Sequence, residues 1–430
     1  MHRKFISFLI SLSFTLPIST SFAAPQFSDC LLVNPTPSTL SLALPLAPER
    51  LGNKSKVVIG VIPFSFSDAD QSKNRKLVAS DYRSAALNLE ALSQKNVQVD
   101  LKIFPSIKTK ILSKDFGTFS SDFFEDVKKL VIDADPVVDF SNLDTVILQN
   151  VSTGVNAKEA AMAYQLSRNP GSSSYSSLQT QEGFIDNAIL LGGALHSGVI
   201  AHEILHNFGL VDLYPSESGI SDFSSMALAV RGQPLRILNY EKAVLGWFPI
   251  GNIQCSSFQD FTTRPIAENE IVFEDITQDQ LFVLKLNEYD AYVVETQNSN
   301  LIVYSIQNKE YPPVSMVSRN VFGIQSQLLS LSSIYSISES FVSTDFTLVY
   351  MSKFNNRVTL NIVPTNKVGT MEFESLIQKS AKHKAEAIAT INTRKTIKVT
   401  KILCTKGQKT KTVKGKNPKC PKGFAKRIRP

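Results

Sequence analysis

The chain has 430 residues, of which 43% are hydrophobic and 19% are charged. That length can bury one large core or two smaller ones, and the composition excludes a collagen, a coiled coil and a wholly disordered chain. The formal net charge of +7 is unevenly divided, because residues 367–430 hold 18 Lys plus Arg against three Glu. We therefore expect an acidic body that carries a basic tail.

Residues 1–23 have the features of an export signal. A basic start at residues 2–4 precedes an apolar run from Phe5 to Leu16, and small residues around Ala23 offer a cleavage position. The run is shorter than the roughly 20 residues that a membrane span needs. We expect a secreted, extracellular or cell-surface-associated protein with no transmembrane segment after signal cleavage.

The four cysteines of an exported chain can form disulfides. They allow three pairings. Cys404 and Cys420 share the tail, so we favour that pair, which leaves Cys30 with Cys255. A metal knuckle in the tail is the weaker alternative, because the tail offers only His383 as a further ligand.

Strand and helix patterns alternate in the first third of the chain. Residues 24–50 are rich in Pro, Ser and Leu and indicate an irregular leader or short propeptide. Beyond them, β-branched runs and alternating polarity predict strands, and apolar residues at helical spacing predict helices. The predicted strands are 56–62, 97–103 and 144–148, and the predicted helices are 79–95 (from Ala86, Leu87, Leu89 and Leu92) and 123–132. This alternation favours α/β or α+β layers.

The pattern changes after about residue 150. A Ser-, Asn- and Gly-rich loop is predicted at 167–182 and a helix at 197–210. Short β-branched and aromatic runs indicate a smaller β-rich domain at 251–365, after a first domain at 51–250. Residues 366–396 suit a linker or helix, and residues 397–430 form a basic, Cys-paired C-terminal module.

The segment His202-Glu203-Ile204-Leu205-His206 carries the strongest chemical signal. Two His four residues apart lie on one face of a helix, so both imidazoles can bind one zinc ion. Glu203 follows the first His directly, where it can act as general base on a metal-activated water without ligating the ion.

Gly209 permits a turn after this helix that brings Asp212 back toward the metal. Three protein ligands would leave one position open, as in catalytic zinc sites. Asp212 otherwise suits a helix-terminal or calcium-binding carboxylate. Glu241, on a predicted helix, is the alternative third ligand, whereas His196 suits a loop or an outer contact.

The segment Ala201–Tyr214, with its H-E-x-x-H-x-x-G-x-x-D spacing, resembles the immune inhibitor A family of secreted metallopeptidases, which are metzincin-type zincins. Members typically have Pro where this chain has Val211. The resemblance covers roughly residues 55–250 and extends to further segments, namely 135–144, Ser224-Ser225-Met226, Glu241-Lys242 and Leu245-Gly246-Trp247.

The resemblance implies an α+β fold with a two-lobed zincin-like catalytic domain, and endopeptidase activity on protein or peptide substrates. It implies His202, His206 and Asp212 as zinc ligands and Glu203 as general base. Met226 would form a Met-turn beneath the metal. Tyr214 and Tyr240 are oxyanion candidates by sequence proximity alone. Calcium is a second cofactor to consider, although no acidic loop motif marks a site.

Two other functions stay open at this point. One is a zinc exopeptidase that uses Glu241 as third ligand. The other is a surface-binding protein with a vestigial zinc site, in which the β-rich domain and tail carry the function. The basic tail itself suits an anionic cell-surface polymer and no specific nucleic acid, or serves solubility alone.

Overall fold

The computed structural model describes residues 27–34, 40–116, 122–153, 161–165, 177–193, 195–214, 220–297, 300–309, 314–316, 334–337, 346–354, 356–396, 400–406, 409–415 and 418–426. Helices and strands are both abundant, which confirms the α+β class. The predicted export signal and most of the predicted loop at 167–182 lie outside the described residues.

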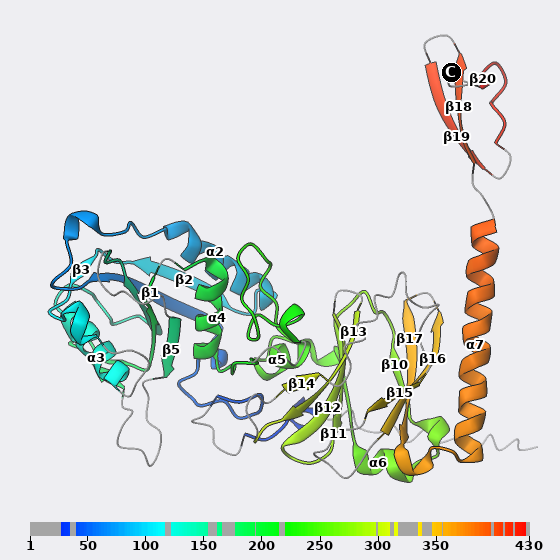
Figure 1. Ribbon diagram of the computed structural model, residues 1–430, viewed down its shortest axis with the longest axis horizontal. Helices are drawn as coiled ribbons and strands as arrows, with labels where there is room; N and C mark the ends of the chain where they lie inside the picture. Colours follow the sequence, from blue (N-terminus) through cyan, green and yellow to red (C-terminus); the bar gives the residue numbers. More distant parts are fainter. Residues whose placement is uncertain are drawn as a thin grey trace, which may run out of the picture.

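A six-stranded sheet lies at the centre of the first half of the chain (Figure 1). Its order is β2-β1-β4-β8-β5, and β3 also pairs with β1. All pairings are parallel except that of β5 with β8, which is antiparallel. The strands are β1 (Lys56–Ser65), β2 (Gln98–Ile103), β3 (Ile107–Lys108), β4 (Thr145–Asn150), β5 (Ala161–Gln165) and β8 (Asn187–Leu191). The three predicted strands are confirmed, whereas β5 was not predicted.

Helices cover both faces of this sheet. Odd-numbered residues of β1, such as Ile59, share a core with α2 (Ala79–Leu92) and α4 (Ser197–Phe208). Even-numbered residues, such as Phe64, share a second core with α3 (Asp122–Ala134). Burial on both faces explains why β1 and β4 are mainly continuous apolar runs rather than alternating ones.

Helix α2 turns inward three of the four apolar residues that the sequence suggested, Ala86, Leu89 and Leu92. Its buried side chains are Tyr82, Ala85, Ala86 and Leu89, which follow the i, i+3, i+4, i+7 spacing of one helical face. Leu87 falls off that face and is 64% exposed. Its place in the predicted apolar stripe was therefore wrong.

The described part of the predicted leader belongs to the main core. Helix α1 (Phe27–Cys30) ends at Cys30, which forms a disulfide with Cys255. Leu42 is fully buried in the same cluster as the buried face of α4. The amide of Leu32 donates a hydrogen bond to the Tyr240 hydroxyl (2.9 Å). These residues therefore support the fold as an integral part of it.

The β-rich region after residue 250 is a sandwich of two sheets. One sheet has the order β14-β13-β12-β11-β9 and the other β10-β17-β16-β15. Phe282 and Leu284 of β11 face the second sheet, whereas Leu281 and Val283 face the core that holds α4. One core thus runs across the predicted boundary at 250. The strands are β9 (Ile253–Ser257), β10 (Glu270–Phe273), β11 (Gln280–Lys285), β12 (Asp290–Gln297), β13 (Asn300–Gln307), β14 (Val314–Met316), β15 (Ile334–Ile337), β16 (Phe346–Phe354) and β17 (Arg357–Pro364), with helix α6 (Phe258–Thr263) between β9 and β10.

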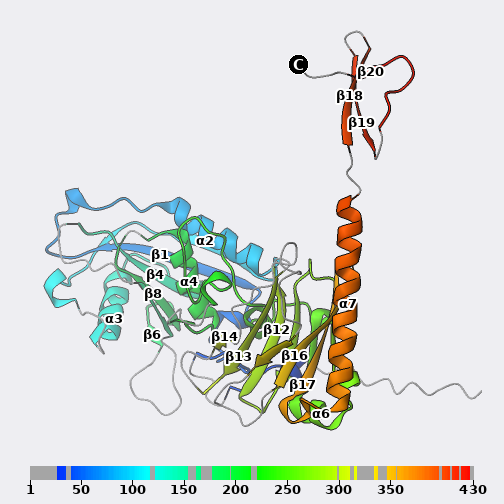
Figure 2. The same cartoon turned by 45° about the vertical axis from the view of Figure 1, so that its right-hand side comes forward.

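Helix α7 (Met371–Thr396) occupies the predicted linker and leads to a small hairpin (Figures 1 and 2). Its first turns bury Phe373 and Leu376 against β16 and β17. The hairpin consists of β18 (Thr400–Lys406), β19 (Lys409–Gly415) and β20 (Ala425–Lys426), and the Cys404–Cys420 disulfide closes it. Both predicted disulfides are therefore confirmed. None of the described helices is long and apolar enough to cross a membrane.

Truncating a leader side chain tests its structural role. Leu42→Ala should lower the free energy of unfolding by about 2–5 kcal/mol, because it leaves a cavity in the core. Leu87→Ala, at an exposed position, is the matched control and should change stability by less than about 0.5 kcal/mol. Urea denaturation measures both, and equal midpoints for the two variants would show that the leader is dispensable.

Candidate metal centre

Helix α4 presents the predicted ligands from within the core. The His196 side chain accepts a hydrogen bond from the Gly198 amide (3.2 Å) and caps the helix start. Gly209 ends the helix at a φ of 123°, and its amide donates to the carbonyls of Leu205 and His206. A side chain at position 209 would be strained at that φ, so glycine is what allows the chain to reverse there.

The two imidazoles lie next to each other and share a carboxylate. The ring centroids of His202 and His206 are 4.7 Å apart, with the planes nearly perpendicular. One Asp212 oxygen, Oδ1, lies 3.2 Å from Nε2 of His202 and 3.1 Å from Nε2 of His206. The structure thus brings together the three residues that the sequence proposed as ligands.

Backbone carbonyls orient both rings. Nδ1 of His202 lies 2.8 Å from the Ser225 carbonyl oxygen, and Nδ1 of His206 lies 2.8 Å from that of Leu210. A carbonyl oxygen can only accept, so Nδ1 carries the proton in each ring. A ring held in this way, when neutral, presents its Nε2 lone pair toward Asp212, which is the form that binds a metal.

Three acceptors facing one point indicate a cation between them. Asp212 Oδ1 is buried and has no hydrogen-bond donor among the described residues. Burial raises the pKa of Asp212, but hydrogen bonds and charge from the two imidazoles, when these are protonated, lower it by more, so in the metal-free protein the group is a carboxylate. Tetrahedral zinc at about 2.0–2.1 Å from its ligands holds them about 3.3 Å apart. The observed 3.1 Å and 3.2 Å separations fit such an ion.

The segment Ser224-Ser225-Met226, which the resemblance suggested as a Met-turn, contacts this group. Ser225 supplies the carbonyl that orients His202, and the next residue, Met226, is fully buried. The Met226 carbonyl accepts from the Leu213 amide (3.0 Å), one residue after Asp212. This one turn therefore holds both the His202 ring and the segment that carries Asp212.

Two anchors of α4 were not predicted from the sequence. Arg50 is buried and donates to the His206 carbonyl (3.2 Å), and burial lowers its pKa to about 10. It places positive charge at the negative end of the helix dipole. Asn207 donates to Thr145 on β4 (2.9 Å) and ties the helix to the sheet. Both contacts join residues far apart in the sequence, so no local pattern marks them.

Glu203 lies beside the ligands with 6% of its surface exposed. Its charge acts on His202, which places it near that imidazole. Buried carboxylates are expensive, so this one is expected to have a specific function.

The structure separates the two tyrosines proposed by sequence proximity. The Tyr214 ring is roughly parallel to that of His202 at a centroid distance of 6.5 Å, and the residue is 46% exposed. Tyr240 is fully buried, with its hydroxyl at the Leu32 amide. Tyr214 is therefore beside the metal group, and Tyr240 belongs to the core.

Glu241 does not belong to the metal group that the described residues form. It lies on α5 (Asn239–Val244), fully buried, and its Oε2 accepts from the Ser224 hydroxyl (2.8 Å) and the Leu238 amide (2.7 Å). Burial raises its pKa to about 8, opposed by these hydrogen bonds and supported by the charge of Glu295. Glu241 therefore holds Ser224, the first residue of the segment that was suggested as a Met-turn.

No model of a known protein family matches this chain, and no curated protein matches it either. The assignment of the centre therefore depends on its own geometry.

The third ligand can be tested by metal analysis. Loss of a residue that hydrogen-bonds to a metal ligand lowers metal affinity by about 10–100-fold. Asp212→Ala should weaken zinc binding by more than that, because it removes a ligand atom. Glu241→Gln, which keeps a side-chain oxygen for Ser224 and Leu238, should retain zinc. Zinc content after dialysis against a weak chelator measures both variants, and the opposite pattern would make Glu241 the ligand.

The raised pKa of Glu241 predicts a pH dependence of stability. The folded state keeps the Glu241 proton up to about pH 8, whereas the unfolded state loses it near pH 4.5. The folded state binds more protons in that window, so the stability of the metal-free protein should fall as pH rises from about 4.5 to 8. Melting temperatures across this range measure the slope, and Glu241→Gln should reduce it. An identical slope in the variant would show that Glu241 does not have the raised pKa.

Proposed function

We propose that this protein is a zinc-dependent endopeptidase. The observation that carries the proposal is the meeting of two imidazole lone pairs and an otherwise unpartnered carboxylate oxygen at one point. His202, His206 and Asp212 would hold the ion and leave a position for water and substrate. Zinc bound in such a site acts as a Lewis acid and makes water a nucleophile near neutral pH.

Glu203 is the base in this proposal. It follows the first ligand on the helix, is nearly buried and acts on His202. From there it can take a proton from the attacking water and return it to the leaving amine. Tyr214 lies beside the same imidazole with its ring partly exposed, so its hydroxyl is the nearest candidate to stabilise a developing oxyanion.

The surroundings of α4 support a zincin-like catalytic domain. The helix packs beside β5, the only described strand of the central sheet that runs against its neighbour. In the described part of that sheet, β5 is the edge strand and pairs with β8. Such an edge can bind an extended peptide through backbone hydrogen bonds. This favours cleavage within a chain.

The two alternatives have less support. The exopeptidase reading needs Glu241 as a ligand, and Glu241 instead bonds to Ser224 and Leu238. A vestigial site has less support, because the three ligand candidates are brought together and Glu203 follows the first of them on the same helix. Calcium gains no support, since the described residues hold a single group of metal-ligating side chains.

The role of Glu203 is tested by Glu203→Gln. The amide keeps the shape of the side chain but cannot accept the proton, so casein cleavage should fall by about 100-fold to 10,000-fold. Zinc content should stay at the wild-type level. Glu125→Gln on the surface of α3 is the matched control and should cleave normally. Wild-type cleavage by Glu203→Gln would sink the proposal.

A further inference from the structure

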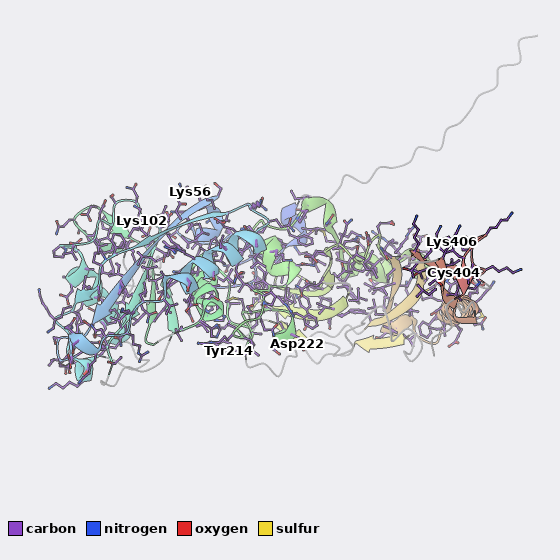
Figure 3. The ribbon with its side chains drawn as sticks, turned by 90° about the horizontal axis from the view of Figure 1, so that it is seen from above. Lys56, Lys102, Tyr214, Asp222, Cys404 and Lys406 are labelled. Atoms are coloured by element: carbon purple, nitrogen blue, oxygen red, sulfur yellow. A yellow bond between two sulfur atoms is a disulfide. The ribbon has the colours of Figure 1, made fainter. Side chains whose placement is uncertain are left out.

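We propose that the C-terminal hairpin is a binding site for a linear, phosphate-bearing polymer. The hairpin consists of β18, β19 and β20, and it stands at the far end of α7 in Figures 1 and 2. Figure 3 places Lys406 and Cys404 at one end of the molecule and Tyr214, whose ring lies beside His202, well away from them. A ligand on the hairpin therefore leaves the metal centre open.

The hairpin has a strong excess of one charge. Residues 397–430 contain 12 Lys plus Arg and no Asp or Glu. Among the described residues, no lysine of the hairpin forms an ion pair with the acidic body. The cations of the hairpin are thus available to an external anion.

Cross-strand pairing holds like charges together. Lys406 pairs directly with Lys409. Like charges at directly opposed positions destabilise a sheet. The backbone pairing of β18 with β19 keeps these lysines opposite each other despite that repulsion, and the Cys404–Cys420 disulfide ties β18 to the segment that leads into β20. An anionic ligand would relieve the repulsion, so binding and the fold of the hairpin reinforce each other.

The distribution of lysines favours a flexible polymer over a flat membrane. Lys409 and Lys411 lie on one face of β19, and Lys414 lies on the other because side chains alternate. All three are exposed. A membrane surface can reach only one face of a hairpin, whereas a polymer chain can pass around both.

The side-chain types indicate the chemistry of the repeat. Every cationic residue in the three strands of the hairpin is a lysine. Lysine carries a compact charge that binds phosphate without the planar fork of arginine. Phe424 is the single aromatic residue in 397–430. Single-stranded nucleic acids need several aromatic platforms for their bases. The hairpin therefore fits a phosphate polymer without bases.

Binding can be measured with the full-length protein and fluorescently labelled long-chain polyphosphate. Wild-type affinity should fall steeply with salt, because each contact releases counterions. The triple variant Lys406→Gln, Lys409→Gln, Lys411→Gln should bind about 10-fold more weakly or worse at low salt, with the slope of log affinity against log salt reduced by about 2. Casein cleavage should not change, which separates this test from that of the proposed function.

Three exposed lysines elsewhere provide the matched control. Lys102→Gln, Lys108→Gln, Lys382→Gln removes the same charge from the body and α7 and should bind polyphosphate within about twofold of wild type. Equal weakening in both triple variants would show that only net charge matters and would overturn the proposal. Tighter binding to single-stranded DNA, or to vesicles of phosphatidylcholine and phosphatidylglycerol, would also overturn it.

Discussion

The candidate centre depends on two hydrogen bonds from imidazole Nδ1 atoms to backbone carbonyls. Ser225 and Leu210 provide those carbonyls, and because neither can donate, Nδ1 keeps its proton and Nε2 of each ring faces Asp212. A side-chain acceptor could rotate away, but these carbonyls are fixed by the turn at Ser224-Ser225-Met226 and by the reversal after Gly209. The local backbone therefore sets the tautomer and the direction of both rings.

The rest of the fold keeps that backbone rigid. Helix α4 packs against β5 and β8 of the central sheet, and buried contacts from Arg50 and Asn207 fix its C-terminal end. Cys30 and Leu42 from the N-terminal segment belong to the same structural unit. The centre is thus supported by residues far outside 51–250, which explains how a short motif can be held accurately enough for chemistry.

Features set by local spacing could be predicted from the sequence. The i, i+4 separation of His202 and His206 places them on one helical face, and the β-branched run of β1 indicated a buried strand. Features set by long-range packing could not. Arg50 meets His206 across 156 positions, and Glu241 turned toward Ser224 rather than the metal group. The leader looked irregular because its leucines have no period, although they fill the core.

Diffraction from crystals grown with zinc, measured on both sides of the zinc absorption edge, tests the central claim most directly. The account predicts one anomalous peak about 2.0–2.1 Å from Nε2 of His202 and of His206 and about 2.0–2.2 Å from Oδ1 of Asp212. A crystal saturated with zinc that shows no peak among these three atoms would contradict the account.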